Sequence, residues 1–268
     1  MSAYNNAGNV DVVFDIAGYF SSLDGPSGSR FHPVDPSRLL DTRGPMSAQR
    51  RLGAEESLQF HVGGANGVPT SGATAVVLNV TAVDTTSAGY MTVWPADVAR
   101  PLASNINFVP RTTVPNLVIV RVPPSGNVNV FNSSGEADVV IDVVGYFDTV
   151  ADRQYGRLVP LEPFRQFDSR DIAFGDDRPM APDSILGLGP GALLPPAYVM
   201  NVTVTGPTSA GYLTVYPGPA RPPLASNLNF APGQTVANLV IVRSGPDVDL
   251  YNSAGNTHVI VDLFAVFS

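Results

Sequence analysis

Three aspartates stand inside strand-like apolar stretches of this 268-residue chain, an unusual setting for a carboxylate. They are Asp15, Asp142 and Asp262, and Val-Ile-Asp-Val-Val at 140–144 is typical of the three. Burying a carboxylate costs free energy unless a partner and hydrogen bonds compensate it. The guanidinium of an arginine can supply both through two parallel hydrogen bonds. We therefore expect each aspartate to form a structural ion pair with an arginine.

The candidate arginines lie in a second repeated phrase, which reads PSRLLDTR at 36–43 and PFRQFDSR at 163–170. They are Arg38 and Arg43 in the first copy, and Arg165 and Arg170 in the second. Two sets of pairs are possible, and in the first of them each aspartate precedes its arginine by 28 residues. One joins Asp15 to Arg43 and Asp142 to Arg170, and the other joins Asp142 to Arg43 and Asp262 to Arg170. Loss of one partner from a buried pair costs roughly 3–5 kcal/mol.

No residue set predicts catalysis. Asp41 and Asp168 recur, but a glycosidase needs a second acid, and none of the glutamates at 55, 56, 136 and 162 has a counterpart in the other repeat. The histidines at 32, 61 and 258 do not recur and lack metal-ligand spacing. The chain has no cysteine and no G-x-S-x-G nucleophile motif. We expect no catalytic residue, no metal and no cofactor.

An aromatic stripe is the main candidate for ligand binding. The phrase SAGYMTVWP at 87–95 returns as SAGYLTVYP at 209–217. In a strand, Met91 and Val93 point to one face, which we assign to the core, and alternate residues point to the other. The residues of that other face are Tyr90, Thr92 and Trp94 in the first copy, and Tyr212, Thr214 and Tyr216 in the second. They form either a platform for a sugar ring or a packing surface against another sheet or unit.

Paired asparagines extend this surface. Asn105 and Asn107 share one strand face, as do Asn227 and Asn229 in the other copy. Because asparagine is disfavoured in strands, these residues need a local reason. They either hydrogen-bond to the backbone of a turn or bulge, or they line a polar groove beside the aromatic stripe.

The composition limits the partners. The formal net charge is −8, every basic side chain is arginine, and no basic stripe is visible, which argues against nucleic acid as a partner. No apolar run reaches the eighteen or more residues of a spanning helix, so we expect no membrane insertion. The first ten residues lack the basic and apolar regions of a signal peptide, so an exported parent would carry its signal upstream of this chain.

These residues belong to a repeat. Residues 79–121 align with 201–243 without a gap and match at 27 of 43 positions, which defines the unit of the fold. A further phrase occurs three times, at 5–20, 132–147 and 252–267. We therefore expect two full units, at 31–148 and 158–268. The segment 1–22 is then the closing β-hairpin of a partial, preceding repeat.

Each unit alternates apolar and polar residues with a period of two, and turn residues follow every 8–12 positions. In the first unit the predicted strands are 38–43, 57–62, 75–83, 89–95, 104–110, 113–122, 127–132 and 137–147. This pattern predicts an all-β fold of two tandem units, each a β-sandwich or a small barrel, without helices.

The phrases PSRLLDTR, VVLNVTAV, SAGYMTVWP, ASNINF, NLVIVRV and DVVIDVVGYF resemble a repeat of secreted and surface proteins of actinobacteria. There the repeat is often appended to cell-wall amidases, peptidases or other exported hydrolases. The resemblance implies an extracellular or cell-surface accessory module without catalytic residues. The second unit departs from the pattern at PFRQFDSR and at FAVF, where VGYF is usual.

Three hypotheses for function follow. The first is a non-catalytic structural or adhesive module that binds cell-wall or environmental polysaccharide. The second is a subunit of an extracellular filament or surface layer, in which copies of the chain assemble through the spare hairpin or a strand edge. The third, a hydrolase, has the least support from the residues.

Overall fold

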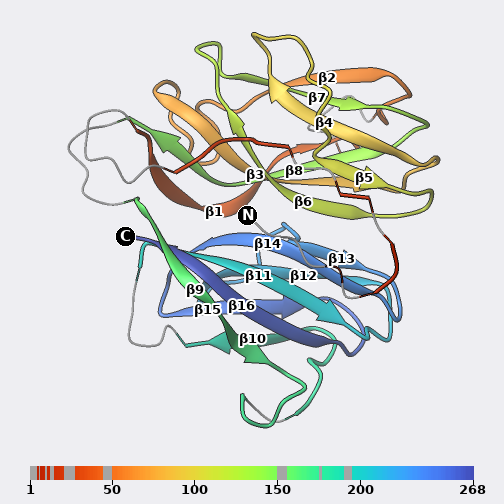
Figure 1. Cartoon of the computed structure of the whole chain (residues 1–268), viewed down its shortest axis with the longest axis vertical. Coiled ribbons are helices and arrows are strands. Elements are labelled where there is room, and N and C mark those ends of the chain that lie inside the picture. Colours follow the sequence, from red (N-terminus) through yellow and green to blue (C-terminus); the bar gives the residue numbers. More distant parts are fainter. Residues whose placement is uncertain are drawn as a thin grey trace.

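A computed structural model of the chain describes residues 5, 7–9, 11–12, 15–20, 28–44, 50–149, 156–174, 177–189 and 195–268. This part of the chain contains sixteen strands and no helix, and the strands form four antiparallel sheets (Figure 1). The predicted all-β class is confirmed. Within the described ranges, no helix has the length and apolar character needed to cross a bilayer.

The first unit has eight strands in two sheets. They are β1 (Arg30–Asp41), β2 (Glu56–His61), β3 (Ala73–Val83), β4 (Gly89–Pro95), β5 (Ile106–Phe108), β6 (Val114–Arg121), β7 (Asn127–Asn132) and β8 (Asp138–Asp148). One sheet has the order β1-β8-β3-β6 and the other β2-β7-β4-β5.

The second unit repeats this arrangement strand for strand. Its strands are β9 (Leu158–Asp168), β10 (Ser184–Leu188), β11 (Ala197–Thr205), β12 (Gly211–Gly218), β13 (Leu228–Phe230), β14 (Thr235–Arg243), β15 (Asp247–Asn252) and β16 (His258–Phe267). The sheets have the orders β9-β16-β11-β14 and β10-β15-β12-β13. Residues at the same place in the two units are called equivalent below.

Each unit is a β-sandwich, because its two separate sheets enclose one apolar core. In the first unit, Leu78 of β3, Ile141 of β8, and Met91 and Val93 of β4 belong to this core. Leu213 and Val215 of β12 take the equivalent places in the second unit. The predicted core face of the repeated aromatic phrase is therefore correct.

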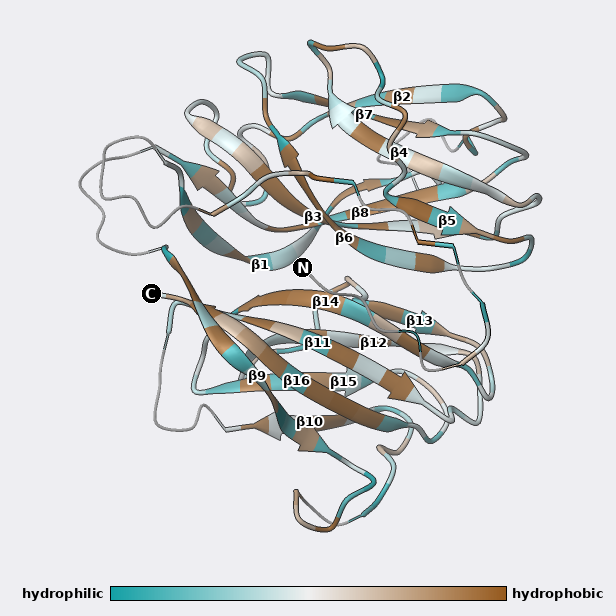
Figure 2. Cartoon of the chain, viewed as in Figure 1, coloured by the Kyte–Doolittle hydropathy of each residue, from teal (hydrophilic) through white to brown (hydrophobic). Residues whose placement is uncertain are grey.

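A third apolar cluster joins the two units. It contains Phe31, Val77 and Phe147 from the first unit, and Val199, Ile241 and Phe267 from the second, among others. These residues lie on the outer faces of the sheets β1-β8-β3-β6 and β9-β16-β11-β14, which face each other in Figure 1. Both sides of these sheets are thus partly buried, which explains why β8 and β16 are apolar on both faces (Figure 2).

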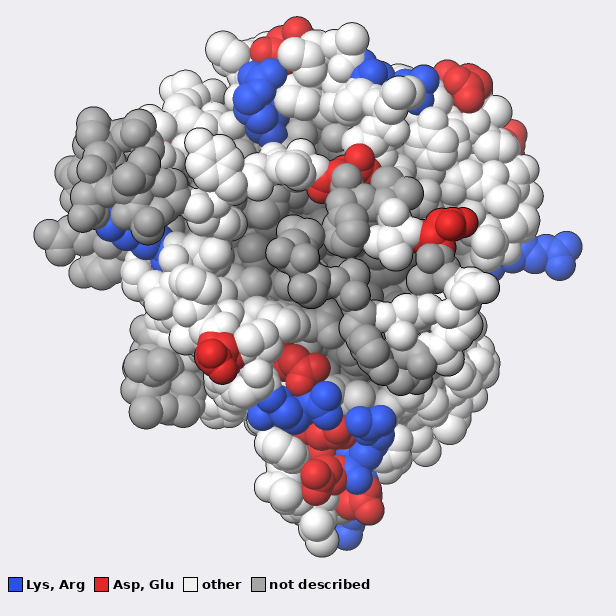
Figure 3. All heavy atoms as spheres, viewed as in Figure 1, with Lys and Arg blue, Asp and Glu red and all other residues white. Residues whose placement is uncertain are grey.

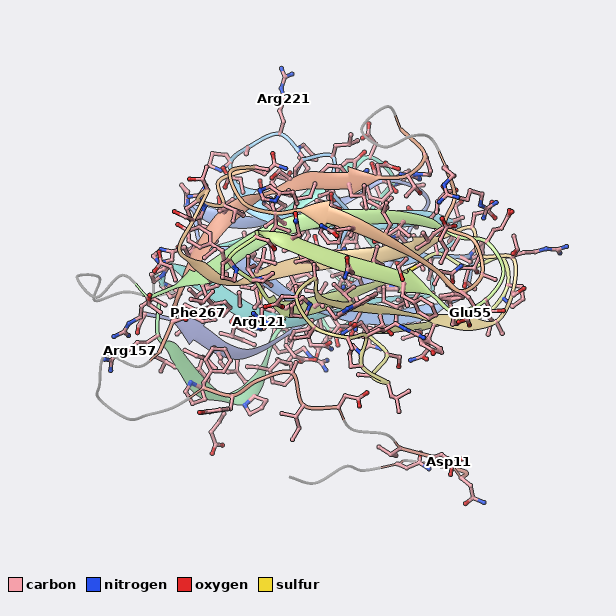
Figure 4. All side chains as sticks on the ribbon, turned by 90° about the horizontal axis from the view of Figure 1, so that it is seen from above. Asp11, Glu55, Arg121, Arg157, Arg221 and Phe267 are labelled. Carbon is pink, nitrogen blue, oxygen red and sulfur yellow. The ribbon has the colours of Figure 1, made fainter. Side chains whose placement is uncertain are left out.

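The predicted hairpin at 1–22 is described only in part. Residues 1–4, 6, 10, 13–14 and 21–22 lie outside the described residues, and none of the described ones in this segment is in a strand. Figure 4 shows Asp11 on a stretch that runs clear of the two sandwiches, whereas Phe267 lies among their strands. The hairpin therefore stays a prediction.

Candidate functional site

Arg38 is the centre of a polar cluster on the outer face of the first unit. It lies directly opposite Asp142 in the β1–β8 register, and its Nε donates to Oδ1 of Asp142 at 2.6 Å. Its Nη1 donates to Oδ2 of Asp41 at 2.7 Å. The side chain of Asp142 is only 1% exposed. Burial raises the pKa of Asp142, and the hydrogen bond from Arg38 opposes this rise.

The predicted ion pair between Asp142 and Arg43 is wrong, because Arg43 binds Asp41 instead. Arg43 follows the end of β1 and donates from Nε and Nη2 to the two oxygens of Asp41, at 2.9 and 2.8 Å. These bonds hold the pKa of Asp41 at about 2, below its usual 3.8. The backbone register brings Arg38, and not Arg43, in front of the buried aspartate. The ion pair within the unit thus forms with the other arginine of the phrase.

The second unit repeats the cluster, and here too the predicted arginine is not the one that pairs with the strand aspartate. Arg165 lies opposite Asp262 and donates from Nε to its Oδ1 at 2.5 Å, and from Nη1 to Asp168 at 2.6 Å. Arg170, the predicted partner of Asp262, instead binds both oxygens of Asp168. The bonds from Arg170 hold the pKa of Asp168 well below its usual range.

The pairs that join different repeats are also wrong. Asp15 is exposed and has no hydrogen bond or ion pair with any described residue, so it does not pair with Arg43. Asp142 does not take Arg170 either, because Arg38 of its own unit occupies it. Asp142 and Asp262 each have a register-matched arginine on the neighbouring strand of their own sandwich.

The polar cluster of the first unit also binds the second unit. Nη2 of Arg38 donates to the carbonyl oxygen of Leu224 at 2.7 Å. Nδ2 of the buried Asn79 donates to the carbonyl oxygen of Ser226 at 2.6 Å. Asn238 donates back to Oδ1 of Asn79 at 3.0 Å. The segment 224–227 of the second unit, here called its docking loop, is thereby held on the first unit.

Two further contacts complete this interface. The backbone N–H of Leu117 in β6 donates to Oδ1 of Asn238 at 3.3 Å. At its rim, Nη2 of Arg243 donates to Oδ1 of Asp35 at 2.6 Å. Asp35 occupies the place in β1 that Glu162 has in β9, as the phrases Pro-Val-Asp-Pro and Pro-Leu-Glu-Pro show. Glu162 therefore has a counterpart, contrary to the sequence-based expectation.

The repeated aromatic phrase holds the docking loops in place. Oγ1 of Thr214 donates to the carbonyl oxygen of Ala225 at 2.6 Å, and the N–H of Val215 donates to Oδ1 of Asn227 at 2.7 Å. The first unit has the same bonds at 102–105, from Thr92 to Ala103 at 2.7 Å and from Val93 to Asn105 at 2.6 Å. The backbone-bonding interpretation of Asn105 and Asn227 agrees with these contacts.

The predicted open stripe for stacking a sugar is wrong at four of its six residues, because these four are buried. Thr92 and Thr214 are fully buried, Trp94 is 6% exposed and Tyr216 is 1% exposed. The indole Nε1 of Trp94 donates to the carbonyl oxygen of Val98, because the chain folds back over this face after β4. Burial raises the pKa of Tyr216, and Asp249 adds to the rise.

Two tyrosines of the stripe remain accessible. Tyr90 pairs with Asn107 across β4 and β5, and Tyr212 pairs with Asn229 across β12 and β13. Tyr212 is 37% exposed and its ring lies 6.1 Å from that of Tyr251. Each unit thus presents one tyrosine beside an asparagine on its surface.

In the described part of the chain, no group of three or more histidine, aspartate or glutamate side chains is arranged to hold a metal ion. His32 contacts Asp148, His61 contacts Asn127 and His258 contacts Ser169, which are three unrelated settings. The sequence matches no protein-family model, and no curated protein aligns with it significantly. The arrangement found twice is the arginine–aspartate cluster, which in the first unit also contacts the docking loop of the second unit.

Proposed function

We propose that this chain is a non-catalytic structural module of an extracellular or cell-surface protein, in which successive β-sandwich units dock on one another. One observation carries the proposal. The polar residues that recur in both units and that a reaction would need are engaged in holding strands, docking loops or the neighbouring unit. The resemblance to repeats of exported proteins supports the location.

The charge distribution agrees with such a role. Basic and acidic side chains lie in small mixed groups on the face seen in Figure 3, and much of the surface between them is uncharged. Ion pairs between exposed or half-exposed side chains include Arg121 with Asp97 and Arg243 with Asp35. A surface of this kind does not attract a polyanion, and it favours contacts with neutral or self-like surfaces.

Unfolding of the intact chain tests the proposal. Trp94 is the only tryptophan, so its fluorescence reports on the first unit, whereas far-UV circular dichroism reports on both. Because the two units share an apolar cluster and a buried polar network, we expect the two signals to change together in urea. Two separate transitions in the wild-type chain would contradict docking.

A matched pair of variants sharpens this test. Leu117 packs against the cluster between the units, and its equivalent Leu239 is 40% exposed. We expect Leu117→Asp to separate the fluorescence and dichroism transitions, and Leu239→Asp to leave them coincident. Equal behaviour of the two variants would show that this surface does not couple the units.

A second candidate function, adhesion to polysaccharide, is favoured by the half-buried Tyr90 and the exposed Tyr212, each of which lies beside an asparagine. Stacking on one aromatic ring is weak, but two linked sites gain from avidity. Co-sedimentation with actinobacterial cell wall, cellulose and chitin tests it. Adhesion predicts pelleting by the wild type that a Tyr90→Ala, Tyr212→Ala variant loses, whereas equal pelleting by both would contradict it.

The second hypothesis from the sequence, assembly of copies through the hairpin at 1–22 or a strand edge, stays a prediction. Most of that hairpin's pairing residues lie outside the described ones or are not in a strand.

A further inference from the structure

Each unit has both a docking loop and an arginine–aspartate cluster that can bind such a loop. Within the chain, only the loop of the second unit is bound to the cluster of the first. Arg165 repeats the bonds of Arg38 to two aspartates, yet no described residue accepts a hydrogen bond from its Nη2. The side chain of Arg165 is 39% exposed, against 15% for Arg38, and Asp262 is 25% exposed, against 1% for Asp142. We call Arg38, Asp142 and Asn79 the docking face of the first unit, and Arg165, Asp262 and Asn201 that of the second. The docking face of the second unit is formed, and the described residues leave it partly exposed.

Apolar residues around this face are uncovered as well. Phe264 is 36% exposed, whereas its equivalent Val144 is buried. Leu239 is 40% exposed, whereas its equivalent Leu117 packs against the cluster between the units. An exposed apolar area with a polar anchor at its centre is typical of a protein interaction surface.

The equivalent loop of the first unit, residues 102–105, is held in the same conformation by the same hydrogen bonds. Asn116 donates to the carbonyl oxygen of Asn105 at 2.7 Å, as Asn238 does to that of Asn227 at 2.8 Å. Asn107 donates to Ser104 at 3.2 Å, as Asn229 does to Ser226 at 3.1 Å. With the two bonds described above, four matched bonds hold each loop. Leu102 at its tip is fully exposed, and its equivalent Leu224 in the docked loop is 82% exposed, so the likeness of the two loops rests on these bonds.

Three equivalent phenylalanines show where another unit belongs. Phe20, Phe147 and Phe267 end the three copies of the repeated closing phrase. The centroids of Phe20 and Phe147 are 6.1 Å apart, those of Phe20 and Phe267 are 6.2 Å apart, and those of Phe147 and Phe267 are 6.3 Å apart. This nearly equilateral triangle is the geometry expected around a pseudo-three-fold axis.

The other residues of the first phrase fit this arrangement. Ile16 is equivalent to Val143, and Tyr19 to Tyr146, both of which pack in or against the core of their own sandwich. Ile16 and Tyr19 are 91% and 90% exposed. Phe20, whose equivalents lie between units, makes ring contacts. Ile16 and Tyr19, whose equivalents pack in their own sandwich, stay exposed.

We infer that a third β-sandwich unit of the same repeat docks here and closes a ring of three, with Asp15–Phe20, which are equivalent to Asp142–Phe147 of β8, in its last strand. Its docking loop takes the face of Arg165 and Asn201, and its own face takes the docking loop at Leu102. Glu162 is placed to accept an arginine from it, as Asp35 accepts Arg243. This inference rests on the proposed structural role of unit docking.

An intact second copy of the chain does not fit the same place. Its first unit carries the free docking loop, but that unit's own docking face is already occupied by its second unit. It therefore cannot accept the loop at Leu102 and close the ring. The occupant is a single unit that lacks its own closing strand.

The test is an extended chain in which a copy of residues 23–131 is placed directly before Asn5. The junction then reads Phe-Asn, as at Phe131 and Asn132, and residues 5–20 complete the added unit. The measurement is amide hydrogen exchange. We expect the N–H of Leu239, which is equivalent to the docked N–H of Leu117, to exchange slower by about tenfold or more than in the original chain. The amides at 102–105 should slow as well.

A variant gives a second readout. Arg165→Ala should lower the melting temperature of the extended chain more than that of the original chain, because only the former buries Arg165. Identical exchange at Leu239 in the two chains would overturn the inference but would leave docking between the two existing units intact.

A second extended chain, with residues 158–251 before Asn5, guards against an incompatible junction. If neither extended chain folds its added unit, residues 5–20 are not a closing strand and the inference fails. Sedimentation of the original chain provides the remaining check. A dimer that protects Leu239 and is lost in Arg165→Ala would assign the face to a second copy and would also overturn the inference.

Discussion

Arg38 and Asp142 lie opposite each other on β1 and β8, and the same guanidinium donates to the carbonyl oxygen of Leu224 in the other unit. One side chain thus neutralises a buried carboxylate and anchors a neighbouring sandwich. Its equivalent, Arg165, keeps the first role without a partner for the second among the described residues. For each docking residue of the first unit, the equivalent residue of the second unit therefore serves as a control that lacks the contact between units.

Asn79 provides the first prediction. It is buried, and Asn79→Ala leaves the carbonyl of Ser226 and the amide of Asn238 without this partner. We expect the free energy of unfolding to fall by about 1–3 kcal/mol, as measured by urea denaturation. Asn201→Ala, at the equivalent and less buried position, should cost less than about 1 kcal/mol. Equal costs would contradict a docking role for Asn79.

Trp94 provides the second prediction. Trp94→Ala removes a large buried ring and the hydrogen bond to Val98, so we expect a loss of about 3–5 kcal/mol in the free energy of unfolding. Circular dichroism measures it, because the variant lacks the tryptophan. Tyr90→Ala, on the same strand face, should cost about 1 kcal/mol. If Trp94→Ala were stable and lost a binding to polysaccharide that the wild type shows, Trp94 would belong to a sugar-stacking stripe after all.

Acid stability provides the third prediction. The pKa of Asp41 is about 2 in the folded chain because of Arg43, and that of Asp168 is also lowered. A carboxyl group with a lowered folded pKa stabilises the fold above its unfolded pKa, and this contribution is lost as the pH falls from about 4 towards 2. Asp142, whose pKa is raised by burial, works in the opposite direction and offsets part of the loss.

The melting temperature between pH 5 and pH 2.5 measures this effect. We expect Asp41→Asn to flatten the fall of stability with decreasing pH, by about 1–2 kcal/mol over that range at most. A pH profile identical to that of the wild type would show that the bonds from Arg43 to Asp41 contribute little.

Local patterns were enough to predict the strands. Period-two alternation and turn residues placed a strand within each of the eight strands of the first unit, although β1 begins at Arg30, well before the predicted start at 38. The apolar character of Met91 and Val93 gave their core face correctly. The choice between sandwich and barrel depended on whether the sheet closes, which is a property of strand order and not of any single strand.

The arginine assignment failed for a reason of register. Irregularities in the β1–β8 pairing between Pro33 and Ser37, and between Arg38 and Leu40, decide which side chain faces Asp142. A bulge of this kind changes which residues oppose each other and leaves no distinct signal in the sequence.

The aromatic stripe failed because a loop covers it. Alternation correctly indicates that Trp94 and Tyr216 point away from the core, but it does not say what lies on the far side. Here the chain that follows the strand returns over that face. The repeated Pro-Leu-Ala-Ser-Asn stretch, which keeps the same residues in both loops, was the available signal for a docking role.

The most direct test of unit docking compares Arg38→Ala with Arg165→Ala in the intact chain by urea denaturation. Arg38→Ala leaves the buried Asp142 without this partner and frees the docking loop at Leu224, so we expect a loss of roughly 3–5 kcal/mol. Arg165→Ala breaks a more exposed pair and should cost about 1 kcal/mol or less. Equal losses for the two variants would contradict a structural role for the contact between the units.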